Sequence, residues 1–150
     1  MPDQELPYMV SVHVKWIESH LMVGADSAGH PLVLSNWPER EPQWGGVKPS
    51  DLLLLAAASC SMYDVVEILR KQRQPLVALE VTCSGERTSE PVNRFTHIHL
   101  HYRATGDIEP QKLERAIRLS AEKYCSVTNS LNVEISRDFE ILPGKYNDRI

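Results

Sequence analysis

The N-terminal third of the chain shows the pattern of hydrophobic and polar positions that is typical of short strands. Apolar and polar side chains alternate over residues 10–14, which is the two-residue period of a strand with one buried face. Two short apolar runs, 21–23 and 32–34, predict two more strands separated by a hairpin loop. Residues 36–49 contain three prolines and two glycines and predict an ordered loop of a length that is often functional.

A long helix is predicted directly after this loop, over residues 49–74. Ser50 is a good N-cap and Asp51 complements the positive end of the helix dipole. Residues 52–58 are apolar on every side, so we expect this half of the helix to be buried all round. A single chain of 150 residues has little material with which to cover such a helix. We therefore expect a second subunit to supply part of the cover.

The second half of the chain alternates strands with one more helix. Strands are predicted over 76–86, 96–102 and 133–141, and a helix over 110–131. Strands that are neighbours in sequence are close enough to pair antiparallel. The order therefore predicts an α+β fold rather than a doubly wound parallel sheet.

Composition and charge restrict the class of protein. Hydrophobic residues make up 42% and charged residues 24%, which is ordinary for a soluble globular protein. The net charge of −4 argues against nucleic acid as a partner. No apolar run reaches the roughly 18 residues of a membrane span, and residues 1–7 lack a signal pattern. We expect one cytoplasmic domain over 1–150, with tails at 1–8 and 143–150 and with no membrane partner.

Three cysteines are the main candidates for chemistry. They are too few and too widely spaced for a disulfide scaffold or a zinc site built on paired cysteines. Cys83 alternates onto the face of Leu79 and Val81, so we interpret it as a core residue. Cys60 and Cys125 lie on the two predicted helices, which must pack on each other. A free cysteine commonly packs as a small hydrophobe, so periodicity alone leaves open whether these sulfurs meet.

Three histidines occupy alternate positions on one predicted strand. His97, His99 and His101 project from one face, and a His-x-His pair can hold zinc. No carboxylate follows them at a telling spacing, so we expect a half-solvated face and no metal. The sequence also lacks a phosphate-binding glycine-rich loop and a dinucleotide fingerprint, and we expect no bound cofactor.

A reactive Cys60 would need a positive charge from outside its own helix. The residue is about ten positions into the predicted helix, and the effect of the helix dipole fades within the first turn. Arg40 precedes Cys60 by 20 residues and lies in the irregular loop, from which it could fold back toward the helix. It is the candidate cation.

These segments resemble those of a known family. Residues 46–61, Gly-Val-Lys-Pro-Ser-Asp-Leu-Leu-Leu-Leu-Ala-Ala-Ala-Ser-Cys-Ser, followed by Asp-Val-Val at 64–66, resemble the central helix of the OsmC/Ohr family. Residues 120–127, Ser-Ala-Glu-Lys-Tyr-Cys-Ser-Val, resemble its second cysteine segment. The order of predicted strands and helices fits that family over about residues 10–141.

The resemblance implies a fold, an assembly and an activity. It implies a two-layer α+β fold with antiparallel sheets and two long central helices, in an intertwined homodimer with active sites at the subunit interface. Characterised members reduce organic hydroperoxides. By this resemblance Cys60 is the peroxidatic thiolate, Cys125 the resolving thiol and Arg40 the activating arginine. The glutamate that orients this arginine in the family falls on Ser50, with Asp51 beside it. The substrate would be a small hydroperoxide and the reductant an external dithiol or lipoyl-type group.

A second hypothesis keeps the fold and discards the chemistry. With Ser50 in place of the glutamate, the thiols could be unactivated. The pocket at the interface would then hold a small apolar ligand or would serve only the stability of the dimer. Alkylation of the thiols across a range of pH distinguishes this binding protein from a peroxidase.

Overall fold

The computed structural model describes residues 7–36, 42 and 45–145 in two compact units, 1–52 and 53–150. The first unit contains the three predicted strands, β1 (His13–Glu18), β2 (Leu21–Ala25) and β3 (Pro31–Leu34), in one antiparallel sheet of that order. β1 starts later than the alternation predicted, because its ladder with β2 begins at the pair His13 and Ala25.

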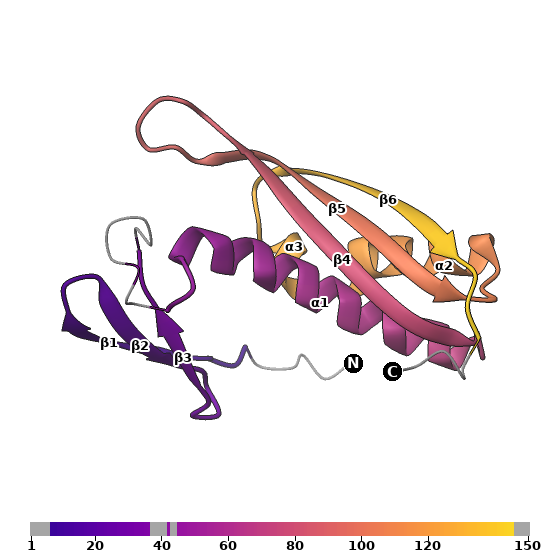
Figure 1. The fold of residues 1–150 in the computed structure, drawn as a ribbon, viewed down its shortest axis with the longest axis horizontal. Coiled ribbons are helices and arrows are strands. Elements are labelled where there is room, and N and C mark those ends of the chain that lie inside the picture. Colours follow the sequence, from indigo (N-terminus) through magenta and orange to yellow (C-terminus); the bar gives the residue numbers. More distant parts are fainter. Residues whose placement is uncertain (1–6, 37–41, 43–44, 146–150) are drawn as a thin grey trace. The chain divides into compact units, whose positions relative to one another are not determined.

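The other elements follow in the predicted order. They are α1 (Pro49–Lys71), β4 (Leu76–Arg87), β5 (Phe95–Gly106), α2 (Pro110–Leu119), a π-helical turn η1 (Ser120–Tyr124), α3 (Ser126–Asn129) and β6 (Glu134–Leu142). Figure 1 shows α1 and α2 on the same side of the sheet formed by β4, β5 and β6. The predicted α+β class is therefore confirmed.

The second sheet is mixed, whereas we expected only antiparallel pairing. β5 is the central strand; it pairs antiparallel with β4 and parallel with β6. The chain leaves the end of β5, runs back along one face of the sheet as α2 and enters β6 in the same direction as β5 (Figure 1). A helical crossover of this kind returns the chain to the starting edge, so the next strand is parallel.

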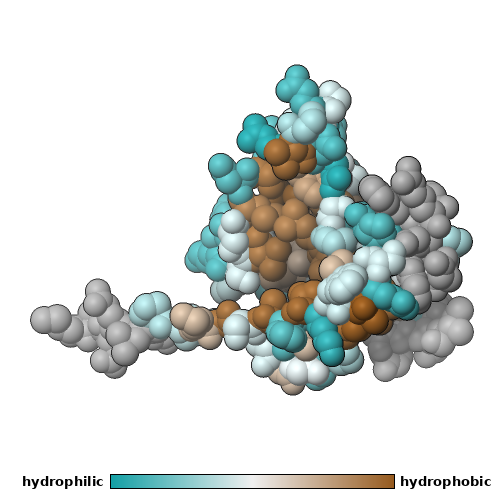
Figure 2. All heavy atoms as spheres, turned by 90° about the vertical axis from the view of Figure 1, so that its left-hand side faces the viewer, coloured by the Kyte–Doolittle hydropathy of each residue, from teal (hydrophilic) through white to brown (hydrophobic). Residues whose placement is uncertain are grey.

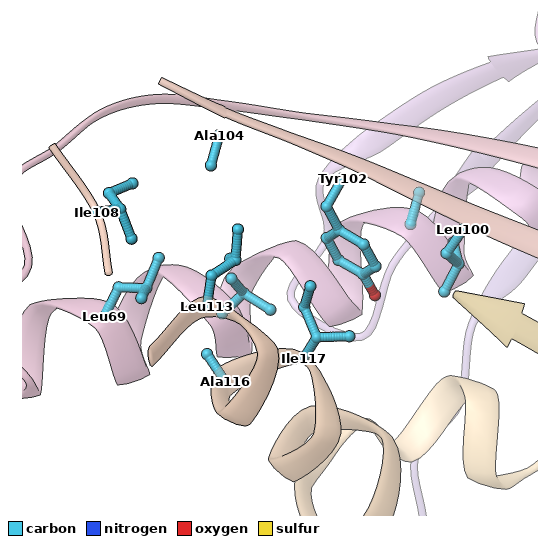
Figure 3. Packing of buried hydrophobic residues seen from close by; sticks show 10 residues of the cluster. Leu69, Leu100, Tyr102, Ala104, Ile108, Leu113, Ala116 and Ile117 are labelled. Atoms are coloured by element: carbon cyan, nitrogen blue, oxygen red, sulfur yellow. The ribbon is translucent and has the colours of Figure 1, made fainter. Parts of the chain in front are cut away.

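The core of the second unit lies between this sheet and the two helices. α1 contributes Ala58, Val65 and Leu69, at the three- and four-residue spacing of one helix face. Figure 3 shows Leu100, Tyr102 and Ala104 of β5 facing the helices. The remaining buried members of this cluster are Ile108, Leu113, Ala116 and Ile117. Cys83 packs against the cluster from β4, as its alternation predicted.

The opposite face of α1 is open within one chain. Leu53 is 36% and Leu55 52% exposed, so the prediction that residues 52–58 are buried all round is wrong for the isolated chain. The reason is that one sheet can cover only one face of a helix. Figure 2 shows that hydrophobic residues also gather on the side of the molecule that it views. By its length and its mean hydropathy of 1.8, α1 is also long and apolar enough to cross a membrane. The apolar core helix of a globular protein meets the same two criteria.

The second predicted helix is interrupted at Cys125. We expected one helix over 110–131, but Cys125 has an extended backbone with φ −74° and ψ 99°. The Cys125 amide donates to the Ser120 carbonyl at 2.8 Å, which closes the wide turn. The Asn129 side-chain amide donates to the Ala121 and Cys125 carbonyls at 2.9 and 2.8 Å. These bonds fix the direction in which the Cys125 side chain leaves the turn.

Candidate active site

Two cysteines and an aspartate meet beside α1. The Sγ atoms of Cys60 and Cys125 and a carboxylate oxygen of Asp64 all lie within 4.8 Å of one another. Cys60 and Asp64 are four residues apart and share one face of α1, and Cys125 arrives from the turn after η1. The fold thus brings together two thiols that are far apart in the chain, and rotation of the side chains can close the remaining gap between the sulfurs.

A chain of buried hydroxyl groups runs away from this cluster. The Ser120 Oγ donates to Oδ2 of Asp64 at 2.9 Å, and it lies 3.2 Å from the Ser61 Oγ. Ser61 in turn forms a short hydrogen bond with the Tyr102 hydroxyl. Ser61, Tyr102 and Ser120 are almost completely buried. Buried hydroxyls cost free energy unless they are paired, so this chain holds its members in fixed positions.

The hydroxyl chain ends beside an arginine on the inner face of the sheet. Burial raises the pKa of the Tyr102 hydroxyl, while its hydrogen bond with Ser61 and the charge and hydrogen bonding of Arg137 act in the opposite direction. Arg137 pairs in register with Leu100, so it alternates onto the core-facing side of β6. Among the described residues its Nε is buried without a hydrogen-bond partner. The site therefore has a cation within the same unit.

Cys125 is the more enclosed of the two thiols. It is fully buried, whereas Cys60 is partly exposed. Burial raises the pKa of the Cys125 thiol, and the neighbouring Cys60 raises it further. The Thr128 amide donates to the Cys125 Sγ at 3.5 Å and lowers this pKa in part. Cys125 is therefore the thiol that gives up its proton less readily than a free cysteine does.

The other candidate residues from the sequence lie elsewhere. Arg40 lies outside the described residues. Ser50 and Asp51 occupy the first turn of α1, about 15 Å along the helix axis from Cys60 at 1.5 Å per residue. They do not belong to the cluster of Cys60, Asp64 and Cys125.

Sequence reasoning missed Asp64, Tyr102 and Arg137 as parts of this site. Asp64 could have been found from its four-residue spacing to Cys60. Arg137 could also have been found from the sequence. It is a charged residue that alternates with Ile135 and Phe139, which pack against the core, and charged side chains are rare at such inward positions. Tyr102 gave no signal, since a tyrosine in an apolar alternation normally marks the core alone.

A pocket opens next to the thiol cluster. It has a volume of about 440 Å³ and is lined by residues of α1 and α2 together with Tyr124 of η1. Asp64 lines this pocket and also belongs to the thiol cluster. The exposed rings of Tyr63 and Tyr124 contribute apolar surface to it. A small organic molecule in the pocket would thus lie near the thiols.

Among the described residues, two donor sets could hold a metal ion. One is the cluster of Cys60, Asp64 and Cys125; the other is His99 and His101 with Asp138. No carboxylate follows the histidines at a telling spacing along the chain, but the structure places Asp138 beside them. The parallel pairing of β5 with β6 places Asp138 opposite His101, which spacing along the chain does not predict.

Comparison with known proteins agrees with this fold. The protein YhfA of Escherichia coli is 39% identical over 137 residues, which cover 89% of this chain and 98% of YhfA. A hypothetical protein from Aquifex aeolicus has a crystal structure that superposes with a TM-score of 0.81 at 26% identity, over 93% of this chain and 100% of that chain.

The fold also occurs in a protein named for peroxide resistance. The organic hydroperoxide resistance protein OhrB of Bacillus subtilis matches with a TM-score of 0.63 at 13% identity, over 89% of this chain and 98% of that chain. At this identity the likeness concerns the fold alone. The profile of the family described as OsmC-like protein matches residues 41–139, from before α1 into β6. With this match and the similarity to YhfA along nearly the whole chain, the protein belongs to the OsmC-like family.

Proposed function

We propose that the protein is a thiol-dependent peroxidase that reduces organic hydroperoxides to alcohols. The observation that carries the proposal is the approach of the Cys60 and Cys125 sulfurs to within 4.8 Å beside Asp64. The family includes proteins named for organic hydroperoxide resistance, which supports the same chemistry. We expect the reaction in the cytoplasm, where thiols are kept reduced.

The first step oxidises Cys60. Its thiol passes the proton to Asp64, and the thiolate attacks the distal oxygen of the peroxide. The O–O bond breaks, the alkoxide takes up a proton and leaves as the alcohol, and Cys60 becomes a sulfenic acid. The partly exposed position of Cys60 and the adjacent pocket give the peroxide a route to the sulfur.

The second step forms the disulfide. The Cys125 sulfur attacks the Cys60 sulfur, an S–S bond forms, and the S–O bond breaks with release of water that carries the Cys125 proton. An external dithiol or lipoyl-type reductant then exchanges with the disulfide, restores both thiols and is itself oxidised. The burial of Cys125 keeps it from reacting with peroxide on its own.

Two arginines supply positive charge in this proposal. Arg137 supplies positive charge near the Tyr102 hydroxyl, on which Cys125 also acts. Arg40, which the family resemblance assigns to Cys60, would stabilise the thiolate and the charge on the peroxide oxygens. Ser50 and Asp51 are the residues with which Arg40 would interact at the start of α1.

We further propose that the working form is a homodimer. Leu53 and Leu55 on α1 are exposed in the single chain, and together with the other apolar residues of this helix they offer a surface for a second copy. Burial of apolar surface stabilises such an association by about 25 cal/mol per Å².

The experiment measures consumption of cumene hydroperoxide with a dithiol as reductant. Wild-type protein should consume it catalytically, Cys60→Ser should be inactive, and Cys125→Ser should stop after one turnover. Cys83→Ser is the matched control, because Cys83 packs in the core away from the cluster, and it should keep its activity. If wild-type protein were no faster than Cys60→Ser, the protein would not be a peroxidase, and the binding function considered above would take its place.

A further inference from the structure

A ladder of histidines and carboxylates covers the outer face of the second sheet. His97, His99 and His101 of β5 face outward, between the buried side chains of Ile98, Leu100 and Tyr102. The parallel register places Ser136, Asp138 and Glu140 of β6 beside them. This face lies opposite the core and shares no residue with the thiol cluster.

Two imidazoles converge on one carboxylate oxygen. Oδ1 of Asp138 lies 2.9 Å from Nε2 of His99 and 2.7 Å from Nδ1 of His101. The three ligand atoms lie within 4.8 Å of one another. A tetrahedral zinc ion binds nitrogen and carboxylate oxygen at about 2.0–2.2 Å. A small rotation of the Asp138 side chain would open the space between these atoms for such an ion.

The second nitrogen of each imidazole is already fixed. Nδ1 of His99 hydrogen-bonds with the Ser136 Oγ at 2.6 Å, and Nε2 of His101 hydrogen-bonds with Glu140 at 3.2 Å. Glu140 is itself held by Nε of Arg103 at 2.7 Å. In metal sites, ligand histidines almost always make a hydrogen bond through the other ring nitrogen, which sets the tautomer and the ring orientation.

The cluster is also accessible and rigidly supported. The side chains of His99 and His101 are 36% and 33% exposed, and that of Asp138 is 60% exposed. All three stand on paired strands, with β5 in the centre of the sheet. Imidazole with carboxylate suits zinc and its neighbours among the transition metals, and solvent can fill the fourth position.

We propose that His99, His101 and Asp138 form a binding site for a divalent transition metal ion, with Zn²⁺ as the expected ion. Ser136 and Glu140 act as positioning residues for the two imidazoles. The site is independent of the proposed peroxidase chemistry, because the thiol cluster lies among the helices on the other side of the sheet (Figure 1).

The test is calorimetric titration of the full chain with zinc chloride. It uses the Cys60→Ser/Cys125→Ser protein, so that the donor set of Cys60, Asp64 and Cys125 cannot bind the ion. We expect one Zn²⁺ per chain, and an affinity at least tenfold lower in His99→Gln and in Asp138→Asn. Ser136→Ala should weaken binding by a smaller factor. Circular dichroism checks that each variant is folded.

The matched control is another histidine–aspartate pair. His30 and Asp26 form an exposed pair at 3.0 Å on the turn between β2 and β3, and among the described residues they belong to no set of three ligand groups within 4.8 Å of one another. His30→Gln should leave the zinc affinity unchanged. The proposal is overturned if no zinc binds, or if His99→Gln and Asp138→Asn bind zinc as tightly as the parent protein. An equal loss in His30→Gln would also overturn it, because the ion would then bind at scattered surface histidines.

Discussion

Arg137 and the Tyr102 hydroxyl interact on the inner face of the second sheet: burial raises the pKa of this hydroxyl, and the charge and hydrogen bonding of Arg137 offset only part of that rise. A guanidinium rarely points into a core, and here Nε has no hydrogen-bond partner among the described residues. Tyr102 also interacts electrostatically with Cys125. The arginine and the buried thiol therefore both act on the same tyrosine hydroxyl.

Arg137→Met should slow the formation of the disulfide. Cys125 has to lose its proton as it attacks, and a nearby positive charge favours this loss in a buried site. We expect a fall of roughly tenfold or more in the rate at which the Cys60 sulfenic acid disappears, measured by rapid mixing with a sulfenic-acid probe. Arg118→Met is the control, since Arg118 of α2 and Arg137 of β6 line a second pocket of about 460 Å³, and Arg118 is not among the groups that shift the pKa of Tyr102. Equal rates in wild type and Arg137→Met would contradict this role.

Tyr102→Phe should destabilise the fold through Ser61. The change removes the tyrosine partner of the buried Ser61 hydroxyl and leaves it only the Ser120 hydroxyl at 3.2 Å, which costs about 1 kcal/mol of unfolding free energy. Each of Tyr102→Phe and Ser61→Ala breaks the same hydrogen bond, so the double variant should lose less than the sum of the two single variants. Urea unfolding of the four proteins measures this coupling. Strict additivity would mean that the hydrogen bond contributes nothing.

The pH dependence of Cys125 follows from its burial. Its folded-state pKa is raised, so the stabilisation linked to the protonated thiol is complete below the unfolded-state pKa of about 8.5 and is lost as the pH rises through the folded-state value. In Cys60→Ser/Cys83→Ser protein, the midpoint for alkylation of Cys125 should therefore lie above about 8.5. A midpoint at or below that of a free thiol would contradict the assignment of burial as the dominant cause.

Self-association should depend on the open face of α1. Sedimentation should give about twice the chain mass of 17.0 kDa, and Leu55→Asp should shift the protein toward monomer because it places a charge on an apolar contact. Val92→Asp is the control, since Val92 is equally apolar and 91% exposed in the loop between β4 and β5. A wild-type monomer, or equal effects of both substitutions, would argue against an interface on α1.

Local patterns predicted most of the elements of this fold. α1 begins at Pro49 and ends before Pro75, and the alternation around Cys83 predicted its place on the core face. The direction of β6 could not be obtained in this way. The direction of β6 depends on how α2 crosses the sheet, which is a tertiary relation. The parallel pairing that results decides which residues of β5 lie opposite Arg137 and Asp138.

The site was harder to predict than the fold. The break at Cys125 has no proline or glycine to announce it; it is held by the Asn129 side chain and by the turn at Ser120. Because we expected an uninterrupted helix, the periodicity of the sequence could not show where the Cys125 sulfur points. The family resemblance singled out the two cysteines, but Asp64 and Tyr102 became visible as neighbours only through the packing of α1 on β5 and η1.

The most direct test of the account is the mass of the reduced protein after one equivalent of cumene hydroperoxide, followed by peptide mapping. The account predicts the loss of two hydrogens and one peptide pair joined between Cys60 and Cys125. Protein that keeps both thiols, or that gains two or three oxygens on Cys60 without a link to Cys125, would contradict it.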